Sequence, residues 1–244
     1  LSVLTLSVLT SNLGIKIIPY CILLFLFLTW ISTIFVKKTK DILKKDATSL
    51  LSTVLKPAVL GILLSCFLMQ LSHGPFYAFF AIYLTENSYS TNAIGIIWSL
   101  GVIAEILIFM KISSWIPKYG LKNLFVISFL FAVFRWLLIS LFPQNLAIVI
   151  LATLFHAITY GMYHAVSISL IHEYFTGILQ GRGQALYSSV SFGLGGSLGS
   201  FYSGYLWEQV GGSTVFLYAG LFAFLGFIVS FILVKSRNKS YIKS

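Results

Sequence analysis

The sequence contains little charge and very little acid. Asp, Glu, Lys and Arg make up only 9% of its 244 residues, and six residues are acidic, whereas a soluble domain carries about 25% charged residues. Hydrophobic residues make up 58%, and the mean hydropathy is +0.96. This shortage of charge excludes a cytosolic enzyme, a disordered tail and a nucleic-acid-binding domain. It predicts an integral membrane protein.

The sequence is also poor in residues that build covalent or metal centres. Its two cysteines, Cys21 and Cys66, lie in apolar runs, so both are predicted to be packing residues without a disulfide or a metal. It has no phosphate loop, C-x-x-C pair, H-E-x-x-H motif or nucleophile elbow. We therefore expect no enzyme, no cofactor and no metal.

Long apolar runs with little or no charge predict transmembrane helices, because about 20 apolar residues cross the hydrocarbon core of a bilayer. Seven runs are near that length: 17–36, 57–84, 92–110, 123–142, 145–171, 185–206 and 214–234. The first fourteen residues, which repeat the pentad LSVLT, are too short to span. The predicted fold class is an all-α integral membrane protein with about seven transmembrane helices.

The positions of Lys and Arg predict how these helices are oriented. All sixteen except Lys16 and Arg135 fall in four segments: 37–56, 111–122, 172–184 and 235–244. The alternate connections contain none. By the positive-inside rule, the basic segments and the C-terminus are predicted to be cytoplasmic. Contact of the polybasic stretch 37–45 with anionic lipid is a second interpretation.

The basic segment 37–56 separates one predicted helix from six closely connected ones, a layout typical of half a transporter. It divides the chain into an N-terminal part (1–36), a cytoplasmic linker (37–56), a six-helix bundle (57–234) and a basic tail (235–244). A seven-helix receptor is an alternative. A retinal-type photoreceptor is not, because its last helix would need a lysine and 214–234 has none.

Ionisable residues inside the predicted helices are candidate functional residues, because a charged side chain at that depth costs about 2.5–3.5 kcal/mol on insertion scales. The candidates are Glu105, Arg135, His73, His156 and His164. With a rise of 1.5 Å per residue, Glu105 and His164 lie roughly 9–10 Å from the cytoplasmic helix ends. Arg135 and His156 lie deeper. The sequence thus permits two layers, Glu105 with His164 and Arg135 with His156.

A carboxylate beside a histidine in a low dielectric suits proton transfer, and Arg135 suits the carboxylate of Glu105 or of a ligand. His156, Tyr160 and His164 share one helix face. The structural alternatives are a self-neutralising Glu105–Arg135 pair and histidines bonded to a neighbouring backbone.

Gly74-Pro75 is predicted to break the second predicted helix with a kink, about two-thirds of the way across. His73 precedes Gly74-Pro75 and is predicted to bond carbonyls that the kink frees. Aromatic side chains near this depth predict a substrate pocket with Tyr77, Trp98 and Tyr160, although packing alone is an alternative role for each. In the sixth run, Gly195-x-x-x-Gly199 predicts close approach of two helices.

Several segments resemble one transporter family. The connection 113–123 resembles a degenerate copy of the loop G-x-x-x-[DN]-[RK]-x-G-[RK]-[RK] of the major facilitator superfamily, in which Lys118, Gly120 and Lys122 match and Pro117 replaces the acid. Four further segments resemble its phenylpropionate permease branch, a relative of oligosaccharide:proton symporters such as lactose permease. They are 95–109, 134–136, 156–165 and 183–200. The resemblance implies that the first predicted helix is helix 6, and that 57–234 forms helices 7–12, of a twelve-helix fold.

By this resemblance, Glu105, Arg135 and His156 match residues of lactose permease that take part in sugar binding and proton coupling. The helix-10 carboxylate of that protein falls on Thr159, so Glu105 becomes the expected proton carrier. The absence of an initiator Met at Leu1 also suggests a C-terminal fragment of a longer protein, whose missing N-terminal half would be a partner.

The expected function is proton-coupled symport of a small organic solute by alternating access in the bacterial inner membrane. The expected partners are protons, the solute and the lipid bilayer. Arg135 near aromatic residues favours an aromatic carboxylate such as 3-phenylpropionate. The alternatives are a sugar or nucleoside symporter, a seven-helix receptor and a non-transporting membrane protein.

Overall fold

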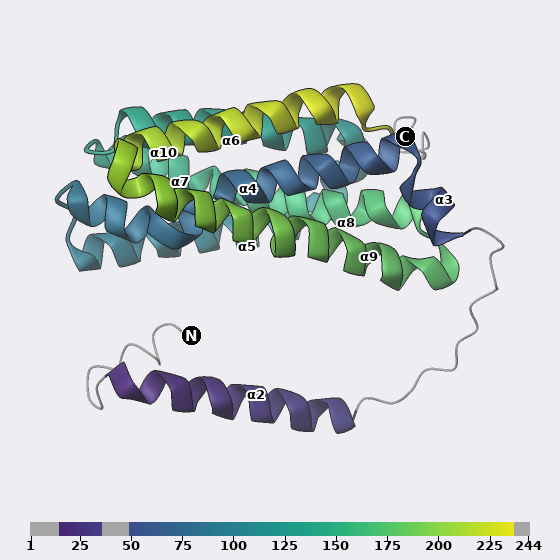
Figure 1. Cartoon of the computed structure of the whole chain (residues 1–244), viewed down its shortest axis with the longest axis horizontal. Coiled ribbons are helices and arrows are strands. Elements are labelled where there is room, and N and C mark those ends of the chain that lie inside the picture. Colours follow the sequence, from purple (N-terminus) through teal and green to yellow (C-terminus); the bar gives the residue numbers. More distant parts are fainter. Residues whose placement is uncertain (1–14, 36–48, 237–244) are drawn as a thin grey trace. The chain divides into compact units, whose positions relative to one another are not determined.

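The computed structural model describes residues 15–35 and 49–236 of a chain that divides into two units, Leu1–Leu43 and Lys44–Ser244 (Figure 1). The repeated LSVLT pentad, most of the predicted linker 37–56 and most of the predicted tail 235–244 lie outside the described residues.

The described part of the first unit, residues 15–35, forms one apolar helix. A short 3-10 turn, η1 (Ile15–Ile17), leads into α2 (Ile18–Ile34), which corresponds to the predicted run 17–36. None of the 17 residues of α2 is buried. A helix that is apolar on all sides is stable only in an apolar environment, such as lipid or other helices.

The second unit is a bundle of roughly parallel and antiparallel helices (Figure 1). In chain order its elements are α3 (Leu50–Val54), α4 (Pro57–Glu86), α5 (Thr91–Tyr119), α6 (Leu121–Leu141), α7 (Leu146–Leu154), the π-helix η2 (Ala157–Met162), α8 (Tyr163–Tyr174), η3 (Gly177–Leu179), α9 (Gln180–Ser188), the π-helix η4 (Ser189–Gly196) and α10 (Ser197–Leu233). The described residues contain no strand, which confirms the all-α class.

Short polar residues begin two of these helices. Ser90 accepts a hydrogen bond from the Ala93 amide at the start of α5, and Asn145 accepts one from the Ile148 amide at the start of α7. Such N-caps satisfy amides that have no partner within the helix.

Five helical stretches of the described chain are long and apolar enough to cross a membrane. The prediction was seven. The 17-residue α2 falls just short of that length, and the predicted helices 185–206 and 214–234 belong to one helical stretch, Gly177–Leu233. This stretch folds back at Gly211, whose φ of 78° favours glycine (Figure 1).

Two expected interruptions differ in the structure. The predicted cytoplasmic connection 111–122 is mostly helix, because α5 continues past Lys111 to Tyr119 and only Gly120, with φ 78°, separates it from α6. Lysines end an apolar run, but they do not end a helix. Gly74-Pro75 does not break the second predicted helix either, since α4 is continuous through Pro75.

The helix α4 is closely approached, through glycine, by η4 and by the start of α10. A Cβ on Gly195 would lie 2.6 Å from the carbonyl oxygen of Phe67, and one on Gly199 would lie 2.7 Å from that of Leu71. No larger residue fits at either position, so the predicted small-residue packing is confirmed.

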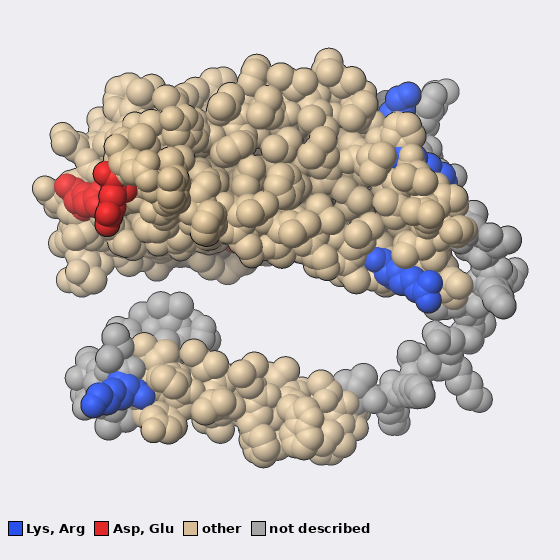
Figure 2. All heavy atoms as spheres, in the orientation of Figure 1, with Lys and Arg blue, Asp and Glu red and all other residues tan. Residues whose placement is uncertain are grey.

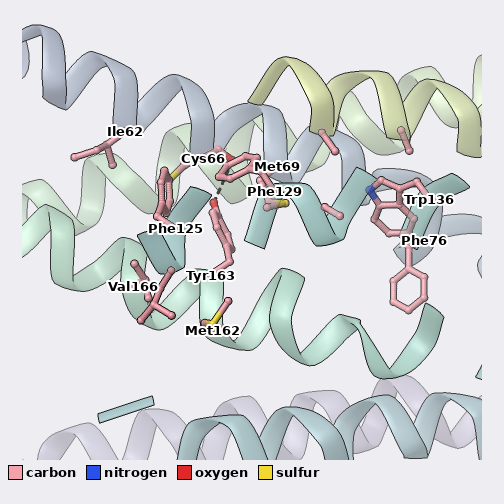
Figure 3. Packing of buried hydrophobic residues seen from close by; sticks show 14 of the residues in the cluster. Ile62, Cys66, Met69, Phe76, Phe125, Phe129, Trp136, Met162, Tyr163 and Val166 are labelled. Atoms are coloured by element: carbon pink, nitrogen blue, oxygen red, sulfur yellow. Dashed lines mark hydrogen bonds between the residues drawn. The ribbon is translucent and has the colours of Figure 1, made fainter. Parts of the chain in front are cut away.

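Part of the buried core lies between α4, α6 and α8. Figure 3 shows Cys66, Phe125, Phe129 and Tyr163 packed together, with the Tyr163 hydroxyl donating to the Cys66 carbonyl oxygen at 3.3 Å. Cys66 is fully buried and Cys21 is half-buried, and neither forms a disulfide. Cys66 therefore packs as expected.

The second unit has a basic end and an acidic end. Lys56 precedes α4 and Glu86 ends it, and Figure 2 shows Lys and Arg gathered at one end of this unit and acidic residues at the other. Because α5 runs antiparallel to α4, Lys118 and Lys122 lie at the Lys56 end.

Candidate functional site: the Arg135 cluster

Arg135 of α6 is fully buried and lies against two aromatic rings. Its guanidinium carbon is 4.1 Å from the ring centroid of Phe76 and 4.3 Å from that of Trp136. Figure 3 shows these two rings beside each other. Cation–π contacts stabilise a desolvated guanidinium, but they leave its N–H groups without acceptors.

One guanidinium nitrogen holds three helical segments together. Arg135 Nη1 lies 3.2 Å from His73 Nε2, 3.1 Å from His156 Nδ1 and 3.1 Å from Thr159 Oγ1. His73 belongs to α4, His156 lies at the junction of α7 and η2, and Thr159 lies within η2. Since Nη1 carries two hydrogens, the three acceptors share them.

The hydrogen bonds of His73 fix its tautomer. Its Nδ1 lies 2.9 Å from the Met69 carbonyl oxygen, which can only accept, so Nδ1 carries the hydrogen and Nε2 accepts from Arg135. The predicted role of His73 is therefore wrong, because Pro75 frees the carbonyl of Leu71 and not that of Met69. An ionisable residue at this depth is the sequence signal for the contact of His73 with Arg135, but the neighbouring proline favoured the other interpretation.

His156 lies between a cation and an acid. Because its Nδ1 accepts from Arg135, its Nε2 carries the hydrogen, and this atom is 3.8 Å from Glu105 Oε2. If Nδ1 also carried a proton, its N–H would face the Nη1–H of Arg135, and two donors cannot form a hydrogen bond with each other. Protonation of His156 and its hydrogen bond to Arg135 therefore exclude each other.

Glu105 of α5 reaches His156 across the surface of η2. A Cβ on Gly161 would lie 2.9 Å from Glu105 Cγ, so glycine makes room for this side chain. The side chain of Glu105 is 17% exposed. Among the described residues Glu105 and Arg135 form no direct ion pair, and the alternative of a self-neutralising pair is wrong for this conformation.

The guanidinium keeps one edge free. Nε and Nη2 of Arg135 are buried and have no hydrogen-bond partner among the described residues. These atoms belong to the planar fork with which arginine binds a carboxylate through two parallel hydrogen bonds. A buried donor without a partner is costly, which makes this edge the strongest indication of a ligand.

A column of parallel rings leads away from this cluster. The rings of His156 and Tyr160 are 5.1 Å apart and inclined by 10°, and those of Tyr160 and His164 are 6.1 Å apart and inclined by 7°. At the far end His164 Nδ1 is 2.9 Å from the hydroxyl of Tyr187, a residue that the sequence analysis did not identify.

The predicted layer of Glu105 with His164 is therefore wrong. Glu105 meets His156, because α5 extends to Tyr119 and places Glu105 fourteen residues, or roughly 21 Å, from the end of its helix.

The predicted aromatic pocket residues lie near this cluster. The Tyr77 ring, 46% exposed, lies 6.2 Å from His156 and 6.1 Å from Tyr160, and Trp98 packs 4.6 Å from Phe76. Their proposed contact with a substrate stays a prediction. The motif residues lie away from this cluster, at the basic end: Lys118 near the end of α5, Gly120 between the helices and Lys122 at the start of α6.

Comparison with known proteins identifies the family. The model of the MFS_1-like family matches residues 1–218. The chain belongs to this family. The match supports the predicted resemblance to the phenylpropionate permease branch of the major facilitator superfamily.

Two curated relatives illustrate the match. The "probable 3-phenylpropionic acid transporter" of Escherichia coli is 30% identical over 148 residues, which are 59% of this chain and 38% of that protein. The "uncharacterized transporter YwbF" of Bacillus subtilis is 24% identical over 205 residues, 84% of this chain and 50% of that protein. The chain thus spans half or less of the length of these MFS relatives.

Proposed function

We propose that this chain is part of a secondary transporter that carries a small aromatic carboxylate together with a proton by alternating access. The observation that carries the proposal is the unpartnered, buried Nε–Nη2 edge of Arg135. The naming of both relatives as transporters, one of them for 3-phenylpropionic acid, supports the class of function and of substrate.

The surroundings of Arg135 fit an aromatic acid. Two hydrogen bonds from the free edge would hold the carboxylate, and the adjoining rings of Phe76, Trp98 and Trp136 offer an apolar contact for an aromatic group. A sugar or nucleoside is the alternative substrate, and it would need several neutral hydrogen-bond partners instead.

Charge balance couples the carboxylate to a proton. With an ionised Glu105 and no substrate, the positive charge of Arg135 and the negative charge of Glu105 cancel across His156. A bound substrate carboxylate adds a second negative charge, and an uncompensated charge at membrane depth costs a few kcal/mol. Protonation of Glu105 restores neutrality. Substrate and proton therefore bind together more favourably than either binds alone, which is the requirement for symport.

The proposal includes a location and partners. The basic end of the second unit faces the cytoplasm of a bacterial inner membrane by the positive-inside rule. A further bundle of the same protein completes the transport path, consistent with the greater length of the relatives.

The test uses the complete protein in vesicles that contain a pH-sensitive dye. We expect 3-phenylpropionate to acidify the lumen when it is added outside. Glu105→Gln should keep substrate exchange while it abolishes acidification and uptake driven by a pH gradient. Lys111→Gln, which removes an exposed charge from the same helix, is the control. Acidification by lactose or a nucleoside alone would contradict the carboxylate proposal, and coupled uptake by Glu105→Gln would contradict the role of Glu105.

A further inference from the structure

A second site lies at the basic end of the bundle. A cavity of about 780 Å3 opens between α5, α6, η2 and the last turns of α10, within the range of about 300–1,000 Å3 typical of small-molecule sites. None of the residues that contact Arg135 lines it. It is therefore separate from the proposed transport site.

The lining of this groove changes from polar to apolar along α6. Lys118, Lys122 and the aromatic residues Trp115 and Tyr119 lie at the end of the bundle, and apolar residues as far as Leu130 continue the groove. From Lys122 to Leu130 the helix rises roughly 12 Å, close to the depth of one leaflet of a core about 30 Å thick. Trp and Tyr beside Lys are typical of the level of lipid headgroups.

The two lysines lack an anionic partner. Lys122 Nζ donates to the backbone carbonyl oxygen of Phe231 at 3.0 Å, and Lys118 Nζ lies 5.1 Å from the ring centroid of Tyr119. No acidic residue lines the groove, and neither lysine forms an ion pair within the described chain. The apolar wall is open to the outside, since Ile127 and Phe231 are exposed. The groove thus presents two cations above an exposed apolar channel.

We propose that this groove binds an anionic glycerophospholipid. Its phosphate contacts Lys118 and Lys122, and one acyl chain follows α6 to Leu130. Charge complementarity selects this occupant: a neutral lipid leaves the two ammonium groups uncompensated, and a free phosphate leaves the apolar channel empty. The inference is independent of the transported substrate.

The experiment measures lipid binding to the complete purified protein by native mass spectrometry, with phosphatidylglycerol and phosphatidylcholine of equal chain length. We expect phosphatidylglycerol to bind in preference to phosphatidylcholine. Binding should weaken about 30-fold in Lys118→Gln/Lys122→Gln. The control Lys56→Gln/Lys111→Gln removes two exposed charges from the same end outside the groove and should bind as the wild type does.

A second variant tests the channel. Ile127→Trp fills the groove below the lysines without a change in charge, and it should also weaken phosphatidylglycerol binding. Equal losses in the Lys56/Lys111 control, equal binding of the two lipids, or effective competition by glycerol phosphate without acyl chains would overturn the proposal.

Discussion

The two ends of the ring column on η2 and α8 contain the same residue type in different surroundings. At one end His156 lies between the Arg135 guanidinium and the Glu105 carboxylate. At the other end His164 has the neutral hydroxyl of Tyr187 as its hydrogen-bond partner. The two histidines are eight residues apart and each stacks on the ring of Tyr160 between them, so position on the helix does not distinguish them. The partners from other helices do.

From this difference we predict different functions for the two ends. Protonation at the Arg135 end changes the charge balance of a buried cluster, and the hydrogen bond of His156 to Arg135 prevents a second proton on that ring. At the Tyr187 end, the described contacts of His164 include no charged side chain, so protonation of His164 would change no ion pair there. We therefore expect substitutions at the first end to affect transport and substitutions at the second end to affect stability.

The largest effect is expected from Arg135→Lys in the complete protein. Lysine keeps the charge but cannot offer two parallel donors to a carboxylate, and each charged hydrogen bond contributes about 1.5–3 kcal/mol. Uptake of 3-phenylpropionate should fall at least about 100-fold. Near-normal uptake, with protein amount in the membrane checked by immunoblot, would show that the free edge of Arg135 does not bind the substrate.

His73 should have the next largest effect. His73→Phe keeps an aromatic ring but removes one of the three hydrogen-bond acceptors that hold the Arg135 guanidinium in place. We expect KM to rise about tenfold with a much smaller change in the maximal rate, as for loss of one hydrogen bond to a charged group. His73→Gln, whose amide oxygen lies near the position of Nε2, should restore most of the affinity. If Gln and Phe behave alike, His73 does not position Arg135.

The sequence predicts part of this cluster and not the rest, for physical reasons. Helix periodicity and depth place Arg135 near His156, and their side chains do meet. The predicted depth of Glu105 is wrong because it was counted from Lys111. That lysine ends an apolar run, but the helix continues beyond it to Tyr119. The contacts of His73 depend on which backbone carbonyl its Nδ1 hydrogen-bonds, and this cannot be deduced from a single sequence.

Gly161 offers a smaller test of the same end. Gly161→Ala places a Cβ against the Glu105 side chain and pushes the carboxylate away from His156. We expect proton-driven uptake to fall about fivefold, with substrate exchange less affected, because one weak contact costs about 1 kcal/mol. Gly193→Ala is the matched control, since a Cβ there meets nothing within 4 Å. Equal effects of the two alanines would indicate a general effect on the helices.

The smallest effect on transport is expected from Tyr187→Phe at the opposite end of the column. Tyr187 is buried, and the change removes its hydrogen bond to His164 while the ring remains in place. The half-buried His164 can bind water instead, so the free energy of unfolding should fall by only about 0.5–1.5 kcal/mol. A thermal melt of the purified protein measures this loss, and proton-driven uptake should stay within about twofold of the wild type. A large loss of acidification with unchanged stability would instead place the whole column, from His156 to Tyr187, on the path of the proton.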